Sequence, residues 1–199
     1  MEEAKTHFRE FYDIGPIMDI TSIRSYIEQN SSIDAMMPHG FRSYMTGFDY
    51  QTATVDLFNF TAAKFSEYFT KLGDDYRPSG ILYESYPFDQ IIKFPPESSA
   101  YGNRGKHFNC TLAIRWAGSQ HDEWIKAWIK DFVREARAID KREMLLEGKE
   151  PTAENSYVTF HLPDHPAEKA FGGNLERLKE VKREWDPNGR FDKWLNIPI

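Results

Sequence analysis

The spacing of hydrophobic residues along the chain changes several times between patterns typical of strands and of helices. Residues 41–50 are rich in aromatic and β-branched side chains, and residues 79–94 and 106–116 alternate between two faces, which predicts three strands. Residues 55–73 and 121–139 repeat apolar side chains every three or four positions, which predicts two amphipathic helices. A turn-rich connection joins the second and third strands, so we expect them to pair in antiparallel fashion.

The apolar stripes predict which side chains enter the core. The first helix should end at Gly73, a residue that favours a left-handed helix cap, and should bury Phe58, Ala62, Phe65, Phe69 and Leu72. The second helix should bury Trp124, Trp128, Phe132 and Ala136, with Ile125, Ile129 and Val133 beside them. In the strand of 79–94 one face carries Ile81, Tyr83 and Ser85, and the other carries Leu82, Glu84 and Tyr86.

Two further elements are expected near the C-terminus. Residues 156–162 alternate as a strand, and residues 174–185 form an amphipathic helix that Asp186 and Pro187 end, because proline cannot continue a helix. The order of elements predicts an α+β fold, an antiparallel sheet backed by helices on one face. We divide it into an N-terminal helical or irregular segment, a central α+β domain, and a final strand with a C-terminal segment, at residues 1–37, 38–150 and 151–199.

Composition narrows the kinds of partner. The chain has a net charge of −6 and no cluster of basic residues of the kind that nucleic-acid binding requires, so a small organic partner fits better. The single cysteine, Cys110, cannot form a disulfide within the chain. No apolar run reaches membrane-spanning length, and the acidic start differs from a signal peptide, so we expect a cytoplasmic protein. Glycosylation triplets at Asn30, Asn59 and Asn109 keep secretion as the alternative.

The sequence GGNLERLKEVKREWDPNGRF, residues 172–191, resembles the C-terminal segment of berberine bridge enzyme-like FAD-linked oxidases, in the vanillyl-alcohol oxidase superfamily. In that family a Tyr-x-Asn strand precedes a series of Gly-x-Asn, Arg-Leu, Lys, Asp-Pro, Asn and Phe. The matching positions are Tyr157, Gly172, Asn174, Arg177, Leu178, Lys182, Asp186, Pro187, Asn188 and Phe191. Residues 98–116 also resemble the family's strand that follows an Ala-aromatic-x-x-Arg turn and ends in tryptophan.

The resemblance implies the substrate-binding half of an FAD-linked oxidoreductase that acts on a small organic substrate, either a secondary metabolite or a sugar-like molecule. Family members hold most FAD contacts in an N-terminal half that residues 1–37 cannot replace, and no G-x-G-x-x-G motif is present. The terminal helix would then pack on a flavin domain of another chain, or on a second copy of this one. Asn174 and Arg177 are the expected cofactor contacts, and FAD binding by these residues alone should be weak or absent.

The resemblance also assigns site residues. On the strand that ends in tryptophan, Asn109 and Thr111 take the positions that face the flavin, where plant relatives hold an acidic or amide side chain. A threonine is a poor general base near neutral pH, so the usual catalytic group has been replaced, unless both are ordinary strand residues. Tyr157 matches the active-site tyrosine, and Thr159 replaces the asparagine of Tyr-x-Asn. Alternation would place Tyr157, Thr159 and His161 on one face.

Other ionisable candidates lie on the strands. Tyr83 and Tyr86 are suited to hold a flat substrate by stacking and hydrogen bonds, and Glu84 is suited to proton transfer if it is buried. His107 is a further candidate. His161 and His165 are four residues apart, but Pro163 and Pro166 forbid the helix that would pair them, so no metal site is predicted.

Three functions remain open from the sequence. The chain is the substrate domain of an FAD-linked oxidoreductase that needs a separate flavin domain, or a flavin-independent isomerase or cyclase, or a non-catalytic binding remnant. Tyr157 and Glu84 are the expected catalytic residues, and the flavin-independent enzyme could also use a histidine for proton transfer.

Overall fold

The computed structural model describes residues 2–36, 39–151, 157–160, 166–193 and 197–198. They form two compact units, Met1–Pro38 and His39–Ile199. The first unit contains the short helices α1 Glu2–His7, α2 Arg9–Asp13 and α3 Tyr26–Asn30, and none of these helices buries a residue. Nowhere in the described ranges is a helix long and apolar enough to cross a membrane.

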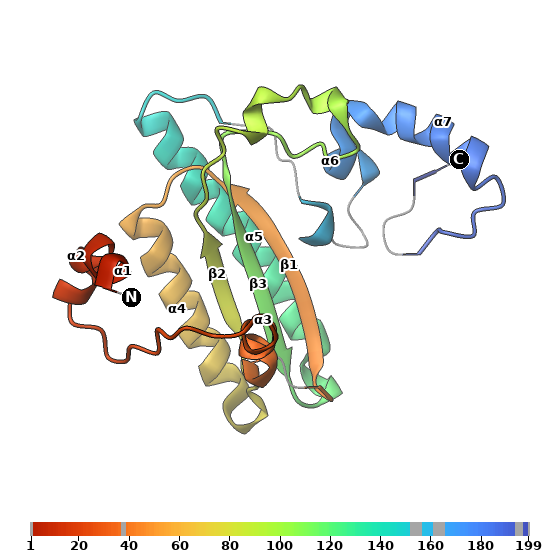
Figure 1. Ribbon diagram of the computed structural model, residues 1–199. Helices are drawn as coiled ribbons and strands as arrows, with labels where there is room; N and C mark the ends of the chain where they lie inside the picture. Colours follow the sequence, from red (N-terminus) through yellow and green to blue (C-terminus); the bar gives the residue numbers. More distant parts are fainter. Residues whose placement is uncertain (1, 37–38, 152–156, 161–165, 194–196, 199) are drawn as a thin grey trace. The chain divides into compact units, whose positions relative to one another are not determined.

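The second unit is an antiparallel sheet with two long helices and a helical C-terminal segment (Figure 1). The sheet has the strand order β1-β3-β2, and every neighbouring pair is antiparallel. The fold class predicted from the sequence is therefore confirmed. In chain order the elements are β1 Arg42–Tyr50, α4 Val55–Leu72, β2 Gly80–Glu84, β3 Phe108–Trp116, α5 Asp122–Leu146, α6 Ala167–Phe171 and α7 Leu175–Trp185.

One face of the sheet packs on α4 and α5 and forms the main core. Figure 1 shows α5 crossing behind the strands. The sheet contributes alternate residues of β1 and β3, as the period of a strand requires: Phe48, Tyr50, Cys110, Leu112, Ile114 and Trp116. The stripe predicted for α5 is confirmed, because Ile125, Trp128, Ile129, Phe132 and Ala136 are all buried.

The stripe predicted for α4 is wrong at several positions. Phe58 and Phe69 are 44% and 40% exposed, and the helix buries Leu57 and Tyr68 together with Leu72. The helix is thus rotated by about one residue from the predicted orientation. The physical reason is Tyr68, whose hydroxyl bonds the carbonyl oxygen of Arg115 and lies 3.0 Å from the Ser79 hydroxyl. A phenol that finds buried polar partners enters the core as readily as phenylalanine.

Two predicted strands differ from the structure. The strand of 79–94 ends at Glu84, and residues 91–93 form a 3-10 turn instead. Pro87 lies just beyond that end and has no N–H to donate to a sheet. The predicted strand of 156–162 is wrong at Val158–Phe160, which form a 3-10 turn closed by a 2.8 Å bond from the Phe160 N–H to the Tyr157 carbonyl.

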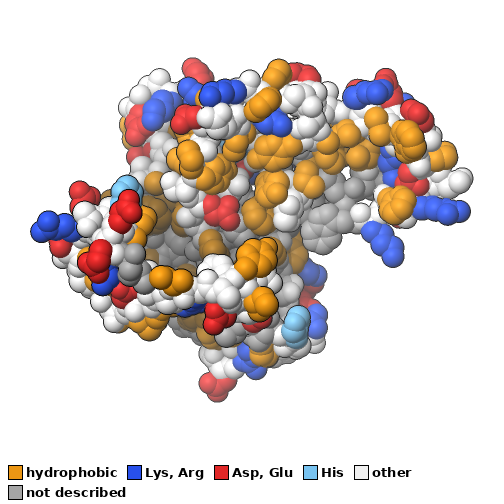
Figure 2. All heavy atoms as spheres, viewed as in Figure 1, with side chains coloured by type: hydrophobic (Ala, Val, Ile, Leu, Met, Phe, Trp, Pro, Cys, Tyr) orange, Lys and Arg blue, Asp and Glu red, His pale blue; other side chains and the backbone are white. Residues whose placement is uncertain are grey.

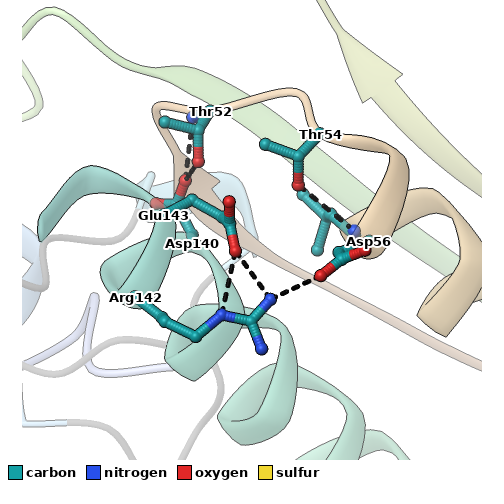
Figure 3. Close-up of polar contacts among 7 residues, drawn as sticks. Thr52, Thr54, Asp56, Asp140, Arg142 and Glu143 are labelled. Carbon is teal, nitrogen blue, oxygen red and sulfur yellow. Dashed lines mark hydrogen bonds and ion pairs between the residues drawn. The ribbon is translucent and has the colours of Figure 1, made fainter. Parts of the chain in front are cut away.

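A buried carboxylate fixes the end of β1 to α5 (Figure 3). Asp140 accepts bonds from the backbone N–H of Gln51 and Thr52 at 3.0 and 2.8 Å and from the Thr52 hydroxyl at 2.6 Å. Beside it, the more exposed Arg142 pairs with Glu143 and reaches Asp56 in the first turn of α4. The turn from β1 into α4 is therefore held from α5.

The C-terminal segment has a small core of its own. Ala167, Ala170, Phe171 and Leu175 are buried there, and Leu178 packs against them. The predicted terminal helix is confirmed as α7, which ends at Trp185. The Asp186 carboxylate accepts bonds from the N–H groups of Arg190 and Phe191 at 2.7 and 3.0 Å, so it organises the turn that follows the helix.

Candidate functional site

The candidate site lies on the face of the sheet that is opposite α4 and α5, which we call the open face. The register places Asp49 beside Asn109 and Asn109 beside Glu84, so these three side chains form one row across the strands. The next row consists of Gly47, Thr111 and Leu82. Side chains alternate along each strand, so both rows project away from the helix-packed core.

The polar row continues into residues just before β3. The Asn103 amide donates a 3.4 Å bond to the Asp49 carboxylate, and His107 Nε2 lies 3.9 Å from the same carboxylate. Asn103 and His107 are 3% and 5% exposed, and the side chain of Asp49 is 10% exposed. The three residues therefore form a buried polar cluster at one end of the sheet.

Burial sets the ionisation of this cluster. It raises the pKa of Asp49 to about 6, although the Asn103 bond and the charge of Arg137 act in the opposite direction. Burial also lowers the pKa of His107. Near pH 7 the contact therefore joins a largely ionised carboxylate to a neutral imidazole, and its proton occupancy changes in mildly acidic solution.

Three buried oxygens on this face lack a hydrogen-bond partner among the described residues. They are Asn103 Oδ1, Asn109 Oδ1 and Thr111 Oγ1. Asn109 and Thr111 are 8% and 6% exposed, so solvent does not readily satisfy them. Buried polar atoms in native proteins are nearly always paired, and an unpaired one costs about 1–3 kcal/mol. The open face thus offers acceptors that suit a molecule with O–H or N–H donors.

Tyrosines surround the polar row. Burial, followed by the proximity of Tyr101, Asp49 and Glu84, raises the pKa of Tyr86 to about 12, so its phenol stays protonated and can donate. The Tyr101 ring meets the Tyr157 ring edge-on at 5.9 Å. Tyr157 therefore joins this group, although the strand that was predicted to carry it does not form.

Gly47 explains how Tyr157 is brought there. A Cβ atom at position 47 would lie 2.5 Å from the Cys110 carbonyl oxygen and 3.0 Å from the Phe160 ring. The Thr46 hydroxyl donates a 3.0 Å bond to the Phe160 carbonyl. Glycine thus permits the 3-10 turn at Val158–Phe160 to pack closely on β1, and this turn follows Tyr157 directly.

The structure brings together only part of the predicted site. Glu84, Asn109 and Thr111 share the open face, and Tyr86 and Tyr157 lie next to it. Tyr83 instead points to the helices, with its hydroxyl 2.6 Å from that of Thr61, and burial raises its pKa. Thr159 is exposed on the 3-10 turn, so it does not share a strand face with Tyr157. His161 and His165 lie outside the described residues.

Asp49 and Asn103 were missed by the sequence analysis. They are 54 positions apart, and only the pairing of β1 with β3 brings them into contact. A carboxylate in the aromatic strand segment GFDY was the one available signal, since a charged residue in such a strand needs a partner when buried.

The two residues assigned to the cofactor lie beside a surface pocket of about 290 Å³, formed where the C-terminal segment meets the 97–100 loop. Asn174 is buried and donates bonds from its amide nitrogen to the carbonyl oxygens of Pro96 and Ser99 at 2.9 and 3.0 Å. Arg177 is exposed and pairs with Glu180 at 2.9 Å. With the Asn174 amide engaged and Glu97 in the lining, this donor set does not fit the pyrophosphate of FAD.

The contacts of Asn174 predict a structural effect of its removal. Asn174→Ala should lower the free energy of unfolding by about 1–2 kcal/mol, because two partly buried hydrogen bonds from a buried side chain are lost. Thermal melts and amide hydrogen exchange in α7 would measure it, with the exposed Asn188→Ala as the control. Equal melts for the two variants would show that the Asn174 bonds do not hold the segment.

Among the described residues, no group of three His, Cys, Asp or Glu side chains is arranged to hold a metal ion. Cys110 is buried and free, and burial strongly raises the pKa of its thiol. A protonated thiol is a weak nucleophile. The groups that the open face and its neighbours present are carboxylates, amides, hydroxyls and phenols.

Comparison with known proteins confirms the resemblance seen in the sequence. Residues 156–198 match the family described as berberine and berberine like. An FAD-linked oxidoreductase of Aspergillus terreus is 25% identical over 127 residues, which are 60% of this chain and 25% of that protein. An FAD-linked oxidoreductase of Pyricularia oryzae is 26% identical over 117 residues, which are 57% of this chain and 22% of that protein. The chain spans about a quarter of the length of these relatives.

Solved structures show the same fold. A variant of berberine bridge enzyme matches all of this chain over 44% of its own length, with a TM-score of 0.68 and 14% identity. CrmK, a flavoenzyme of caerulomycin biosynthesis, matches 94% of this chain over 39% of its own, with a TM-score of 0.62 and 18% identity. The chain thus has the fold of one portion of these larger proteins.

Proposed function

We propose that these residues form the substrate-binding portion of an FAD-linked oxidoreductase that acts on a small organic molecule, a secondary metabolite or a sugar-like compound. The observation that carries the proposal is the open face, where buried acceptors without partners and a group of phenols meet on a sheet. Similarity to FAD-linked oxidoreductases supports the class of reaction. Hydride transfer is chemistry that a flavin supplies, and the residues of this chain would bind and orient the substrate.

The site residues have separate roles in this proposal. Asn109 and Thr111 accept hydrogen bonds from the substrate, and the Tyr86 phenol donates to it or stacks against it. Glu84 is half-buried at the end of the polar row, so it is placed to take a proton from a bound molecule. Tyr157, half-buried beside Tyr101, is the second group for proton transfer. Thr111 would only bind the substrate, because its hydroxyl is not deprotonated near pH 7 and so cannot act as a general base.

FAD would be held mainly by residues outside these 199, on another chain or in a longer polypeptide. The engaged amide of Asn174 supports this, because it is not free to bind a pyrophosphate. Met45 and Leu82 are 41% and 51% exposed on the open face, and Trp185 is exposed on α7. Apolar surface of this kind marks interfaces. Figure 2 shows hydrophobic side chains gathered where the 85–105 connection and the C-terminal segment lie.

The cytoplasm is the proposed location. Asn109, the acceptor of one glycosylation triplet, is buried in β3, so the folded protein does not present it to a glycan. The other two acceptors lie in α3 and α4. A glycan on a helix is compatible with the fold, and mass measurement of protein from its source decides between cytoplasmic and secreted locations.

The proposal predicts how the chain behaves with flavin. Titration of the purified chain with FAD should leave the flavin fluorescence almost unchanged, whereas the chain isolated from its source should retain a flavin-bearing polypeptide. Leu82→Glu on the open face should weaken that association about tenfold or more, because it buries a charge in an apolar contact. Leu146→Glu, on the exposed end of α5, is the matched control. A purified chain that holds one FAD per polypeptide without any partner would overturn the proposal.

A further inference from the structure

The polar cluster contains three residues, Asp49, Asn103 and His107, that have no role in the proposed function so far. Asp49, Asn103 and His107 are all largely buried, and they continue the row formed by Asn109 and Glu84. Burial of a carboxylate without a cation in direct contact is costly. Its hydrogen-bonded neighbour Asn103 leaves its own oxygen unpaired. The cluster therefore gathers acceptors in excess of the donors that the described residues provide.

We propose that Asp49, with Asn103, Asn109 and Thr111, forms a site that binds a hydroxyl group of a neutral ring compound, and that ionised Asp49 is its principal acceptor. This deepens the proposed function, on which it rests, because it names the part of the site that holds the substrate hydroxyl. It is independent of Glu84 and Tyr157, the groups to which proton transfer was assigned.

The acceptors determine the chemistry of the ligand. The Asp49 carboxylate and the amide oxygens of Asn103 and Asn109 can only accept, while the Thr111 hydroxyl can accept or donate. Each ligand O–H group can satisfy one of these acceptors, whereas a carboxylate or phosphate would be repelled. A hydrogen bond to an ionised acceptor is about twice as strong as one between neutral groups. Asp49 lies close enough to the phenols of Tyr86 and Tyr101 to help raise their pKa, so an aromatic ring bound there has aromatic neighbours.

The charge of Asp49 is set by groups from several elements. A neutral His107 precedes β3, Glu84 lies at the end of β2, and Arg137 approaches from α5. Of these, Arg137 favours the ionised form, and burial opposes it. Binding through an ionised Asp49 must therefore weaken as the pH falls through about 6, while binding through the amides and Thr111 alone would be independent of pH.

The test uses the chain alone and two probes. Resorcinol is uncharged between pH 5 and pH 8 and carries hydroxyl donors, and its dimethyl ether keeps the ring without the donors. We expect NMR titration to give a resorcinol association constant that falls about threefold or more from pH 8 to pH 5, in line with a charge-assisted bond. The ether should bind more weakly at both pH values.

Variants separate Asp49 from its surroundings. Asp49→Asn keeps an acceptor for the Asn103 amide and should remove the pH dependence, whereas Thr111→Val should weaken binding but leave the pH dependence. Asp89→Asn changes an exposed carboxylate in the neighbouring loop and should behave as the wild-type chain.

The proposal is overturned if resorcinol does not bind up to its solubility, if the ether binds equally well, or if Asp49→Asn leaves the pH dependence intact. Because FAD takes no part in this titration, its result is separate from that of the flavin experiment. If resorcinol binds but no flavin-bearing polypeptide accompanies the chain from its source, the hydroxyl site stands and the oxidoreductase does not. If a flavin-bearing polypeptide is found but resorcinol does not bind, the oxidoreductase stands and the hydroxyl site does not.

Discussion

Asp140→Ala is expected to lower the free energy of unfolding by about 3 kcal/mol, because the substitution strands three buried donors at once. The carboxylate accepts the N–H groups of Gln51 and Thr52 and the hydroxyl of Thr52, which is 6% exposed. Alanine offers no acceptor for these donors. Urea denaturation followed by circular dichroism would measure the loss.

The neighbouring ion pairs provide the control for this result. Arg142 is half-exposed and bonds Glu143 and Asp56 on the surface (Figure 3). Exposed pairs contribute about 1 kcal/mol or less, so Arg142→Ala should change stability little. Asp140→Asn, which keeps one acceptor, should fall between the two variants. If Arg142→Ala is as destabilising as Asp140→Ala, the turn is held by the surface pairs and not by the buried carboxylate.

Periodicity located most of the helices and strands and failed where a polar side chain decided the packing. In α5 the apolar stripe is continuous, so its buried face followed from spacing. In α4 the apolar and aromatic residues nearly encircle the helix, and the hydrogen bonds of the Tyr68 hydroxyl selected the orientation. Spacing contains no information about such bonds, because their partners lie on other elements.

The same limit applies to the site. Alternation correctly placed Tyr83 and Glu84 on opposite faces of β2, yet it did not show which of the two faces α4 and α5 cover. The contact of Asp49 with Asn103 depends on the register of β1 against β3, which no local pattern specifies. Tyr157 reached the open face through a 3-10 turn that Gly47 permits, and not through the predicted strand.

The contribution of Asp49 to stability should fall as the pH rises from about 4 to about 6. Its pKa is about 6 in the folded chain and near 3.8 when exposed, so the folded state binds more protons in this window than the unfolded state does. The stability that protonation gives is complete below the unfolded pKa and is lost as the pH passes the folded pKa. The shift corresponds to about 3 kcal/mol.

Asp49→Asn removes the buried charge and should therefore raise the free energy of unfolding at pH 8 by about 2–3 kcal/mol. At pH 4 the wild-type chain and the variant should be nearly equal in stability. Chemical denaturation at both pH values measures the difference. A residue that destabilises its own fold when ionised is expected at a binding site. Resorcinol at saturating concentration should narrow the gap at pH 8, since it binds the wild-type chain more tightly. A variant that is less stable than the wild type at pH 8 would show that the Asp49 carboxylate is satisfied by the fold itself and is not an open acceptor.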